Sequence, residues 1–469
     1  MATLALRLFH LDQPIVENYV GRQTPTAMVA RNLDRGSGFL RPTLDTGPHP
    51  NLFLVEPPVY ASMAVGVRRV TGLRLEPAGR LVSALMTTLG VWGLYGLIRR
   101  REGFIAAIAA AVAFAAFPIT VRYGRAFQPD AAMMGAALAG MRCWDEGRRP
   151  WMVAGWLLMG LGLSLKITSA YLLIPLLSIS DRRPRSLILG ASMLVPALLW
   201  YAEVYAVLGP MSASRAAADG ARLWRGAIDV AALGKPGAPT LYGRFLLVRA
   251  FTPLGFGLAA YGFARGVDRL WWTWLGSALA SMAVLAGKLH HEYYWFALAP
   301  PAAAGVGRAL AELSARGVIG RGAAAMLAVS LVGLGLYQSR ATWASPPEWE
   351  GLTDSANIIR KLVPVDAPLV APEALLYAAD RRGCRLEWTP GAVARAAGEW
   401  GAEARDDPRD LIEFYRRHGA RFAADLRGED PRRRLIAPYL RTHHRVLVDD
   451  GRLILAELVA PEPHADARP

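Results

Sequence analysis

The residues that could carry chemistry in this sequence are ionisable and aromatic side chains set among long apolar runs. Lys166 lies in the middle of the apolar run 151–180, beside Ser164, Thr168 and Ser169. A charged side chain at membrane depth costs about 2.5–3.5 kcal/mol even on lenient scales, so such residues usually mark a functional site. A lysine that extends from a helix end to the membrane surface would explain the same pattern. Because Lys166 is central in its run, we favour a functional role.

Other polar groups stand in the segments between the apolar runs. Carboxylates suit general acid–base work, and arginine guanidinium groups suit recognition of a phosphate. Arg122 and Arg125 flank Tyr123 at the end of one run, where interfacial anchoring is the alternative role. Asp130 begins the next helix, where capping is the alternative. The full set is Glu17, Arg22, Gln23, Arg31, Asp45, His49, Glu56, Arg122, Arg125, Asp130, Lys166, His290, His291, Glu292, Tyr293 and Tyr294.

The adjacent His290 and His291, followed by Glu292, raise the question of a metal site. Adjacent side chains point to different faces of a helix, so ligation by both histidines would need an irregular backbone. We therefore favour polar residues at a membrane interface, beside the aromatic run 293–295, and predict no metal ligands. The sequence also lacks glycine-rich phosphate loops, zinc-type Cys/His spacing and a nucleophile elbow. This argues against soluble nucleotide chemistry.

The composition indicates which elements hold these residues. Of the 469 residues, 53% are hydrophobic and 19% are charged, whereas soluble chains carry about 25% charged residues. Lys and Arg number 53 against 38 Asp and Glu, which gives a formal net charge of +15. Hydrophobicity this high argues against a disordered chain, and Cys143 and Cys384 alone cannot form a disulfide scaffold. Because the arginines cluster between apolar runs, we predict an integral membrane protein with no nucleic-acid partner.

Apolar runs recur through the first three quarters of the chain. A hydrocarbon core about 30 Å thick needs roughly 20 apolar residues in a helix. We predict a polytopic α-helical membrane protein of about ten transmembrane helices, with 151–180 forming two helical pieces. Arginine-rich connections then fall on one side, which the positive-inside rule assigns to the cytoplasm. The runs are 80–98, 104–121, 131–141 with its flanks, 151–180, 186–208, 245–264, 270–287, 293–311 and 322–338, and the connections are 99–102, 142–149, 181–185, 265–269 and 308–321.

Two outward-facing parts have their own organisation. The first loop, 10–78, contains the amphipathic segments 24–34 and 57–71, which are typical of helices on a membrane surface. From residue 346 the composition becomes soluble, and short strands alternate with helices, which predicts a small α/β domain over 346–469. Residues 1–345 would form the membrane domain. Because residues 1–9 are too short to span, we expect the first helix to begin upstream or the chain to be truncated.

Six motifs occur in an order that matches a known family. They are GRQTPTAMVARNL (21–33), VEPPVYASM (55–63), GRLVSAL (79–85), RYGRAFQPDAAMM (122–134), LSLKITSAYLLIP (163–175) and HHEYYWFALAP (290–300). Their order resembles that of the GT-C superfamily of polyprenyl-phosphate-sugar-dependent glycosyltransferases. It is most similar to the family 39 or aminoarabinose-transferase-like group, which is related to the dolichyl-phosphate-mannose–protein mannosyltransferases. Single motifs are loose, but their common order is fairly specific.

This resemblance implies a glycosyltransferase of the bacterial inner membrane that inverts the anomeric centre. The donor would be a polyprenyl-phosphate-linked sugar, and the acceptor would be a periplasmic lipid, glycan or protein. Apolar spans in the bilayer would accommodate the polyprenyl tail, and a small α/β domain would lie in the periplasm. No nucleotide is needed, and a divalent cation stays an open option. The residues assigned to the donor phosphate or other substrate groups are Arg22, Gln23, Arg122, Arg125, Lys166, His290, His291, Tyr293 and Tyr294.

One departure from the family pattern leaves the identity of the catalytic base open. The family usually places an acidic pair upstream of an Ala-Arg pair that residues 30–31 match. This chain has Arg22 and Gln23 at the acidic positions. The base must therefore come from another carboxylate that deprotonates the acceptor hydroxyl. The candidate catalytic residues are Glu17, the nearest carboxylate of the first loop, Glu56, which precedes the Pro-Pro segment, and Asp130, which matches the family's second acidic position.

Two other functions fit parts of the pattern. A transporter or lipid flippase would explain an intramembrane lysine. Inverted repeats and broken helices in matching halves are expected there, and the sequence shows neither. A degenerate relative without catalysis, acting as a membrane scaffold with an outer binding domain, is the other alternative. The large polar first loop argues against that scaffold.

Overall fold

The computed structural model describes residues 2–17, 19–180, 184–212, 225–402 and 406–459. The chain forms two compact units that interleave along the sequence. The first unit comprises Met1–Tyr19, Leu33–Arg41 and Leu54–Ala344, and the second comprises Val20–Asn32, Pro42–Phe53 and Ser345–Pro469. Most of the predicted connection 181–185 lies outside the described residues.

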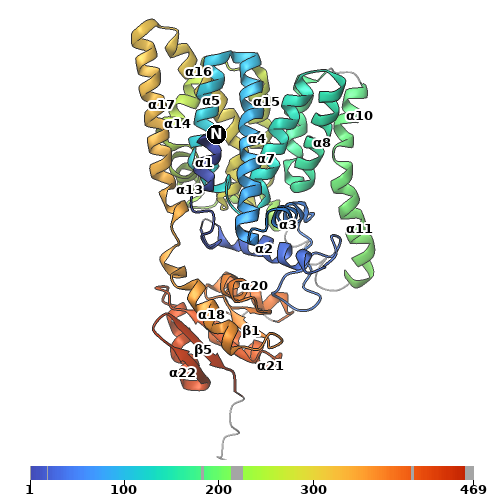
Figure 1. Ribbon diagram of the computed structural model, residues 1–469, viewed down its shortest axis with the longest axis vertical. Coiled ribbons are helices and arrows are strands. Elements are labelled where there is room, and N and C mark those ends of the chain that lie inside the picture. Colours follow the sequence, from blue (N-terminus) through green and yellow to red (C-terminus); the bar gives the residue numbers. More distant parts are fainter. Residues whose placement is uncertain (1, 18, 181–183, 213–224, 403–405, 460–469) are drawn as a thin grey trace, which may run out of the picture. The chain divides into compact units, whose positions relative to one another are not determined.

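The first unit is helical throughout its ordered elements (Figure 1). Short 3-10 or π segments interrupt several helices: η1 (Ile167–Leu172), η3 (Phe245–Ala250), η4 (Ala286–Lys288) and η5 (Glu292–Leu298). The helices are α1 (Ala2–Leu8), α3 (Val59–Thr71), α4 (Leu75–Glu102), α5 (Phe104–Ala116), α6 (Pro118–Tyr123), α7 (Pro129–Asp145), α8 (Arg149–Leu165), α9 (Leu173–Ile179), α10 (Pro184–Ser192), α11 (Val195–Ser212), α13 (Ala238–Arg244), α14 (Thr252–Ala264), α15 (Arg269–Val284), α16 (Ala299–Ser314) and α17 (Gly317–Ser339).

Glycines let these helices approach one another closely. A Cβ atom on Gly262 of α14 would lie 1.8 Å from the carbonyl oxygen of Gly305 on α16. One on Gly93 of α4 would lie 2.5 Å from the backbone of Leu138 on α7. Small residues at helix contacts gain van der Waals packing where lipid supplies no hydrophobic driving force between helices. The helices of the first unit therefore pack backbone against backbone.

Few helices pass a strict test for crossing a membrane. Among the described residues, Leu75–Glu102 and Gly317–Trp349 are long and apolar enough. Two bent pairs raise the number to four if each pair is one span: Ser186–Ser192 with Val195–Ala206, bent by 41°, and Ala238–Ala250 with Thr252–Ala264, bent by 96°. Other apolar helices are shorter, such as Phe104–Ala116, because breaks interrupt them. The predicted ten spans therefore stay a prediction.

Helix α2 (Val20–Asp34) differs from the surface helix predicted over 24–34. A surface helix should bury one apolar stripe, here expected at Ala27, Ala30 and Leu33. In the structure every residue from Gln23 to Ala30 is buried, whereas Leu33 is half-buried. The prediction of a one-sided helix was wrong, because small and polar side chains allow α2 to be enclosed on all sides.

The second unit contains a five-stranded sheet in the order β2-β1-β3-β5-β4. Strand β1 (Leu369–Ala371) pairs in parallel with β2 (Gly383–Arg385) and β3 (Phe422–Leu426), and β5 (Leu453–Glu457) pairs antiparallel with β3 and β4 (Arg445–Asp449). Short strands alternate with helices in this part of the chain, as the sequence predicted. The helices of this unit after residue 345 are α18 (Leu352–Leu362), α19 (Glu373–Ala379), α20 (Pro390–Glu399), α21 (Pro408–Arg417) and α22 (Ile436–His443).

A buried ion pair and an apolar core hold the second unit together. Arg433 donates to both carboxylate oxygens of Asp425, at 2.7–3.0 Å, and its guanidinium lies 4.4 Å from the ring centre of Trp388. Burial raises the pKa of the Asp425 carboxyl, although Arg433 opposes this shift.

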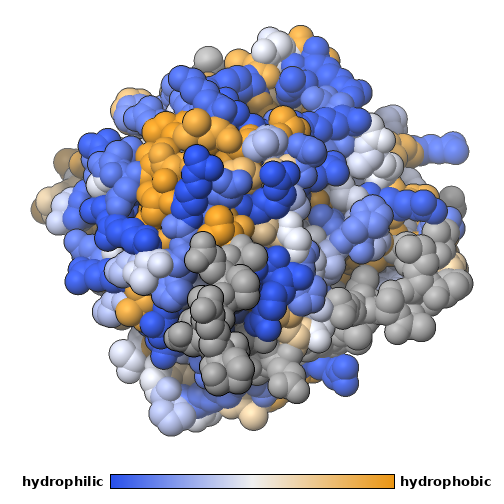
Figure 2. Space-filling model, turned by 90° about the horizontal axis from the view of Figure 1, so that it is seen from below, coloured by the Kyte–Doolittle hydropathy of each residue, from blue (hydrophilic) through white to orange (hydrophobic). Residues whose placement is uncertain are grey.

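Apolar side chains also reach the surface of this unit, including Leu362, Val365 and Leu435. In Figure 2 a cluster of hydrophobic side chains lies among mostly hydrophilic ones.

The close contact between α14 and α16 generates a stability prediction. We expect Gly262→Ala to lower the melting temperature of the detergent-purified chain by about 2–8 °C, since overpacking costs about 1–3 kcal/mol. Gly257→Ala on the same helix is the matched control, because a Cβ there meets no atom within 4 Å. Equal melting temperatures for the two variants would contradict the packing described here.

Candidate active site

Lys166 stands at a break in the helical path. Helix α8 ends at Leu165 and η1 begins at Ile167, and Lys166 between them has an extended backbone with φ −160° and ψ 105°. The Lys166 carbonyl accepts hydrogen bonds from the Ser169 amide at 2.9 Å and from the Ser169 hydroxyl at 2.6 Å. Non-helical backbone at membrane depth is tolerated where it is buried in protein or lines a cavity. The break thus directs the Lys166 side chain into the protein interior.

Asp130 is the partner of Lys166. The Lys166 Nζ donates to Asp130 Oδ1 at 2.6 Å, and the two side chains are only 9% and 2% exposed. Asp130 lies in the first turn of α7 after Pro129, where a negative charge interacts favourably with the helix dipole. Its second oxygen, Oδ2, is buried and has no hydrogen-bond partner among the described residues. This carboxylate oxygen of Asp130 can therefore accept a hydrogen bond from a ligand.

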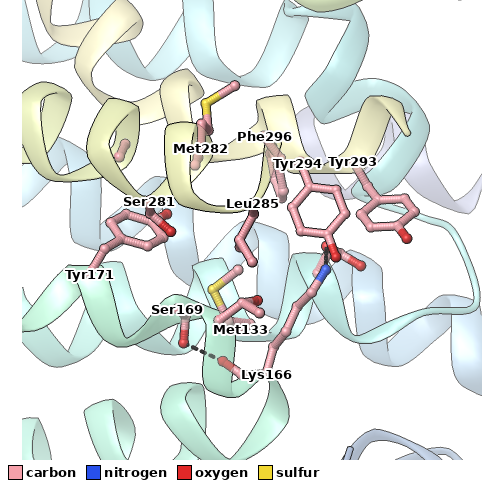
Figure 3. A pocket seen from close by; sticks show the side chains of 14 residues that line it. Met133, Lys166, Ser169, Tyr171, Ser281, Met282, Leu285, Tyr293, Tyr294 and Phe296 are labelled. Atoms are coloured by element: carbon pink, nitrogen blue, oxygen red, sulfur yellow. Dashed lines mark hydrogen bonds and ion pairs between the residues drawn. The ribbon is translucent and has the colours of Figure 1, made fainter. Parts of the chain in front are cut away.

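Two tyrosines complete the surroundings of the ammonium group. The Lys166 Nζ lies 4.4 Å from the ring centre of Tyr293 and 4.9 Å from that of Tyr294, within cation–π range. In Figure 3 the Lys166 side chain extends towards these two rings. The sequence motif around residue 293 thus meets the motif around residue 166 at one point.

A small cavity opens beside this group. Its volume is about 30 Å³, and its walls come from α7, η1, α15 and η5, together with Lys166 and Leu285. Figure 3 shows Met133 and Leu285 at its centre and Tyr171 beside Ser281 at the opposite end from Tyr293. The Tyr171 hydroxyl is buried without a hydrogen-bond partner among the described residues. Sequence reasoning did not identify Tyr171, although it follows Lys166 by five residues in the same motif.

His290 and His291 belong to an aromatic stack. The His291 ring lies 3.8 Å from that of His290, 4.7 Å from that of Tyr19 and 5.4 Å from that of Tyr293. The part of the chain that the structure describes contains no group of three or more His, Cys, Asp or Glu residues able to hold a metal ion. The geometry places these histidines beside Tyr293 and Tyr294, which we call the tyrosine wall.

Arg122 forms an ion pair and hydrogen bonds with other residues of the protein. It donates to Glu292 Oε2 at 2.9 Å and to the Arg249 carbonyl at 3.0 Å, while the Arg249 side chain reaches Glu292 Oε1 at 3.1 Å. Glu292 therefore sits between two guanidinium groups, directly before Tyr293. The arrangement suits Arg122 to hold the tyrosine wall in place. Arg249, which no sequence motif indicated, supplies the second guanidinium group that holds Glu292.

Glu17 forms a buried ion pair with Arg80. The guanidinium Nη2 donates to both carboxylate oxygens at 2.7 Å, and both side chains are 0% exposed. Arg80 also donates to the carbonyls of Leu11, Gln13 and Pro14, so it ties the first loop to α4. This placement suits Glu17 to a structural role better than to proton transfer with an incoming hydroxyl.

The other predicted site residues do not line this cavity. Arg125 is buried and donates to the His10 carbonyl at 2.6 Å. Glu56 is half-buried in the first unit, directly before Pro57 and Pro58. Arg22 and Gln23 belong to the second unit, where Arg22 lies 5.8 Å from the ring centre of Phe53 and Gln23 is fully buried. The structure thus unites Asp130, Lys166, Tyr293 and Tyr294 at one cavity.

Comparisons with known proteins show what the chain is similar to. Residues 55–208 match the family model of the dolichyl-phosphate-mannose-protein mannosyltransferases. A comparison of the sequence with curated proteins gives no match. The family match covers the segment that contains Asp130 and Lys166, and it agrees with the resemblance that the six motifs predicted.

Solved structures show which members of that class the chain is similar to. ArnT from Cupriavidus metallidurans in the apo state matches with a TM-score of 0.67 and 17% identity, over 98% of this chain and 97% of that chain. ArnT from the same organism bound to undecaprenyl phosphate matches with a TM-score of 0.61 and 16% identity, with the same coverage. An oligosaccharyltransferase from Archaeoglobus fulgidus matches with a TM-score of 0.55 and 12% identity, over 90% and 68%.

These comparisons confirm the predicted resemblance to the aminoarabinose-transferase-like group. They also confirm that the fold, which is mostly helical with a small sheet, is similar to that of known membrane glycosyltransferases.

The burial of the Glu17–Arg80 pair predicts the effect of removing its charge. Breaking a buried ion pair by neutralising one partner costs about 3–5 kcal/mol. We therefore expect Glu17→Gln to lower the melting temperature of the purified chain by about 6–20 °C. The exposed Glu350→Gln is the control and should leave the melting temperature unchanged. A Glu17→Gln variant as stable as wild type, but inactive, would favour Glu17 as the base instead.

Proposed function

We propose that this chain is an inverting glycosyltransferase of the bacterial inner membrane. It transfers a sugar from a polyprenyl-phosphate-linked donor to a periplasmic lipid, glycan or protein. The single observation that carries this proposal is the buried Lys166–Asp130 pair, which lines a cavity together with Tyr293 and Tyr294 in a GT-C fold. Cofactor chemistry is unnecessary, because displacement of a phosphate needs only positioned charges and a base.

The proposed topology places the cavity near the outer face. About ten helical passes across the bilayer, with the arginine-rich connections in the cytoplasm, leave the first loop outside. The membrane domain is 1–345, and the domain 346–469 is periplasmic. The second compact unit is consistent with a separate outer body, although it also includes first-loop segments.

Lys166 is the proposed ligand of the donor phosphate. Its ammonium group already lies in a water-poor site, where attraction to a phosphodiester is stronger than in bulk water. The structure of ArnT bound to undecaprenyl phosphate, which has a similar fold, supports a lipid phosphate as the ligand. Asp130 holds Lys166 before the donor arrives, and its unpartnered Oδ2 accepts a hydrogen bond from the bound substrate. Met133 and Leu285 contact the apolar part of the donor.

In the proposed reaction, the acceptor hydroxyl oxygen attacks the anomeric carbon from the side opposite the phosphate. The bond between the anomeric carbon and the phosphate oxygen breaks, and polyprenyl phosphate leaves with that electron pair. The hydroxyl proton passes to a carboxylate, and the anomeric configuration inverts. Lys166 compensates the charge that develops on the leaving phosphate.

Glu56 is the proposed base. It is half-buried, whereas Glu17 and Asp130 are each only 1% exposed. A base must reach the proton of the incoming acceptor, which favours a carboxylate with an exposed face. His290 and His291, which lie beside Tyr293, are proposed to support the wall of the site. Arg22, Gln23 and Arg125 stay predicted substrate-binding residues.

Removal of the Lys166 charge tests the phosphate role. We expect Lys166→Met to lower kcat/KM for transfer of radiolabelled sugar from a polyprenyl-phosphate donor by about 100-fold or more. Lys166→Arg retains a cation and should lose less. Lys235→Met is the control, because Lys235 is exposed and pairs with Asp229. Unchanged transfer by Lys166→Met would rule out this role, and movement of intact donor across the bilayer without transfer would favour a flippase.

Neutralising the proposed base tests the acid–base assignment. We expect Glu56→Gln to lower kcat by about 100-fold or more at neutral pH, since general-base catalysis contributes about 10²–10⁴-fold. Its melting temperature should stay within about 2 °C of wild type, because Glu56 is half-buried and glutamine has nearly the same size and shape. Full activity of Glu56→Gln would return the assignment to Asp130 or Glu17.

A further inference from the structure

The cavity beside Lys166 has a second polar end, which takes no part in the reaction steps proposed above. Figure 3 shows Tyr171 and Ser281 at this end, opposite Tyr293. The Tyr171 hydroxyl is buried and has no hydrogen-bond partner among the described residues. The same holds for Asp130 Oδ2, whose residue also lines the cavity. All residues that line this cavity belong to the first unit.

The break after α8 places Tyr171 in the cavity wall. Tyr171 lies in η1, a 3-10 segment with three residues per turn, so residues three apart share one face. Thr168 and Tyr171 are three apart, and both line the cavity. Helix α15, which packs against η1, contributes Ala278, Ser281 and Met282, which share one helical face. Because alanine and serine are small, this face leaves space next to η1.

The two unpartnered polar atoms indicate which ligand chemistry fits this end. Buried polar groups in proteins nearly always have hydrogen-bond partners, and an unpaired one costs free energy. Asp130 and Tyr171 are close enough to interact electrostatically. An ionised carboxylate only accepts hydrogen bonds, whereas a phenol both donates and accepts, so sugar hydroxyls can satisfy both groups. A hydrocarbon chain can satisfy neither, which makes this end unfavourable for the polyprenyl tail.

The position and size of the cavity agree with a substituent of the transferred sugar. Lys166, the proposed ligand of the donor phosphate, lines the same cavity, and the sugar is bonded directly to that phosphate. A volume of about 30 Å³ holds a small hydroxyl-bearing substituent rather than a whole sugar ring. Met133 and Met282 also line the cavity, and flexible methionine side chains adapt to the shape of a ligand.

We propose that the Tyr171 hydroxyl and Asp130 Oδ2 form a subsite that binds a hydroxyl-bearing substituent of the transferred sugar. Tyr171 is thus a specificity-determining residue, because a sugar without that hydroxyl leaves the phenol and the carboxylate unpaired. This inference rests on the proposed function, since it takes the donor phosphate to bind at Lys166. It adds a requirement on the sugar, namely a free hydroxyl at the position that reaches Tyr171.

Tyr171→Phe removes only the phenol oxygen, so its stability tests whether the hydroxyl is free before the donor binds. The lost hydroxyl has no partner among the described residues, and we expect a melting temperature no lower than that of wild type. Tyr337→Phe makes the same change at an exposed position of α17 and should leave the melting temperature unchanged. A fall of more than about 2 °C for Tyr171→Phe would assign its hydroxyl a structural role and overturn the subsite.

Binding of two kinds of lipid separates contact with the sugar from general damage. The probes are undecaprenyl phosphate, which carries no sugar, and undecaprenyl phosphate carrying glucose, galactose or mannose, of which the one that wild type transfers is used. We expect Tyr171→Phe to raise Kd for the sugar-bearing lipid about tenfold, because one hydrogen bond to the sugar is lost. Kd for undecaprenyl phosphate should not change.

The outcomes distinguish the subsite from the proposed function. Equal changes in Kd for both lipids, or no change for either, overturn the subsite while transfer by wild type leaves the proposed function standing. Failure of wild type to bind or use any of the sugar-bearing lipids would overturn the proposed function and the subsite together.

Discussion

Much of the first unit is arranged so that Lys166 and Asp130 can form an ion pair. An ammonium group among apolar helices requires an opposite charge at close range, because desolvation is expensive. The carboxylate that meets it comes from the first turn of α7, 36 residues earlier, and the ammonium is presented by a residue outside helical geometry. The break after α8, the start of α7 and the two tyrosines of η5 must therefore all converge within a few ångströms.

Other buried or partly buried charged side chains also lie close to a residue of opposite charge. Arg80 encloses the Glu17 carboxylate, Arg122 and Arg249 hold Glu292, and Arg433 holds Asp425. The pairs of Glu17 and Glu292 join elements that are distant in the sequence, whereas Asp425 and Arg433 are eight residues apart. Buried pairs of this kind add little net stability but make alternative arrangements costly, because separation leaves a charge without a partner. In this protein the pairs specify which segments meet, and the glycine contacts specify how closely.

The sequence predicted Lys166 and Asp130 of the cavity because their types are anomalous where they stand. Both interrupt apolar runs, and their motifs occur in a recognised order. Tyr171 was missed, because a tyrosine in an apolar run is common. The pairing of Glu17 was not predictable, because its arginine lies 63 residues away and nothing local marks the contact.

The small α/β domain was predicted from short β-rich runs, whereas the order of its strands was not, because that order depends on contacts between distant segments. The enclosure of α2 was also missed, since contacts such as that of Arg31 with Tyr377 come from segments hundreds of residues later.

The interleaving of the second unit has a consequence for how the protein is made. Arg31 binds the carbonyl of Tyr377, 346 residues further along the chain. At about 5–20 residues per second, synthesis of the intervening segment takes on the order of tens of seconds. During that interval α2 has emerged while the strands and helices that enclose it do not yet exist. Assembly of this unit is therefore a late event in biogenesis, completed only after the final helix of the membrane domain has been translated.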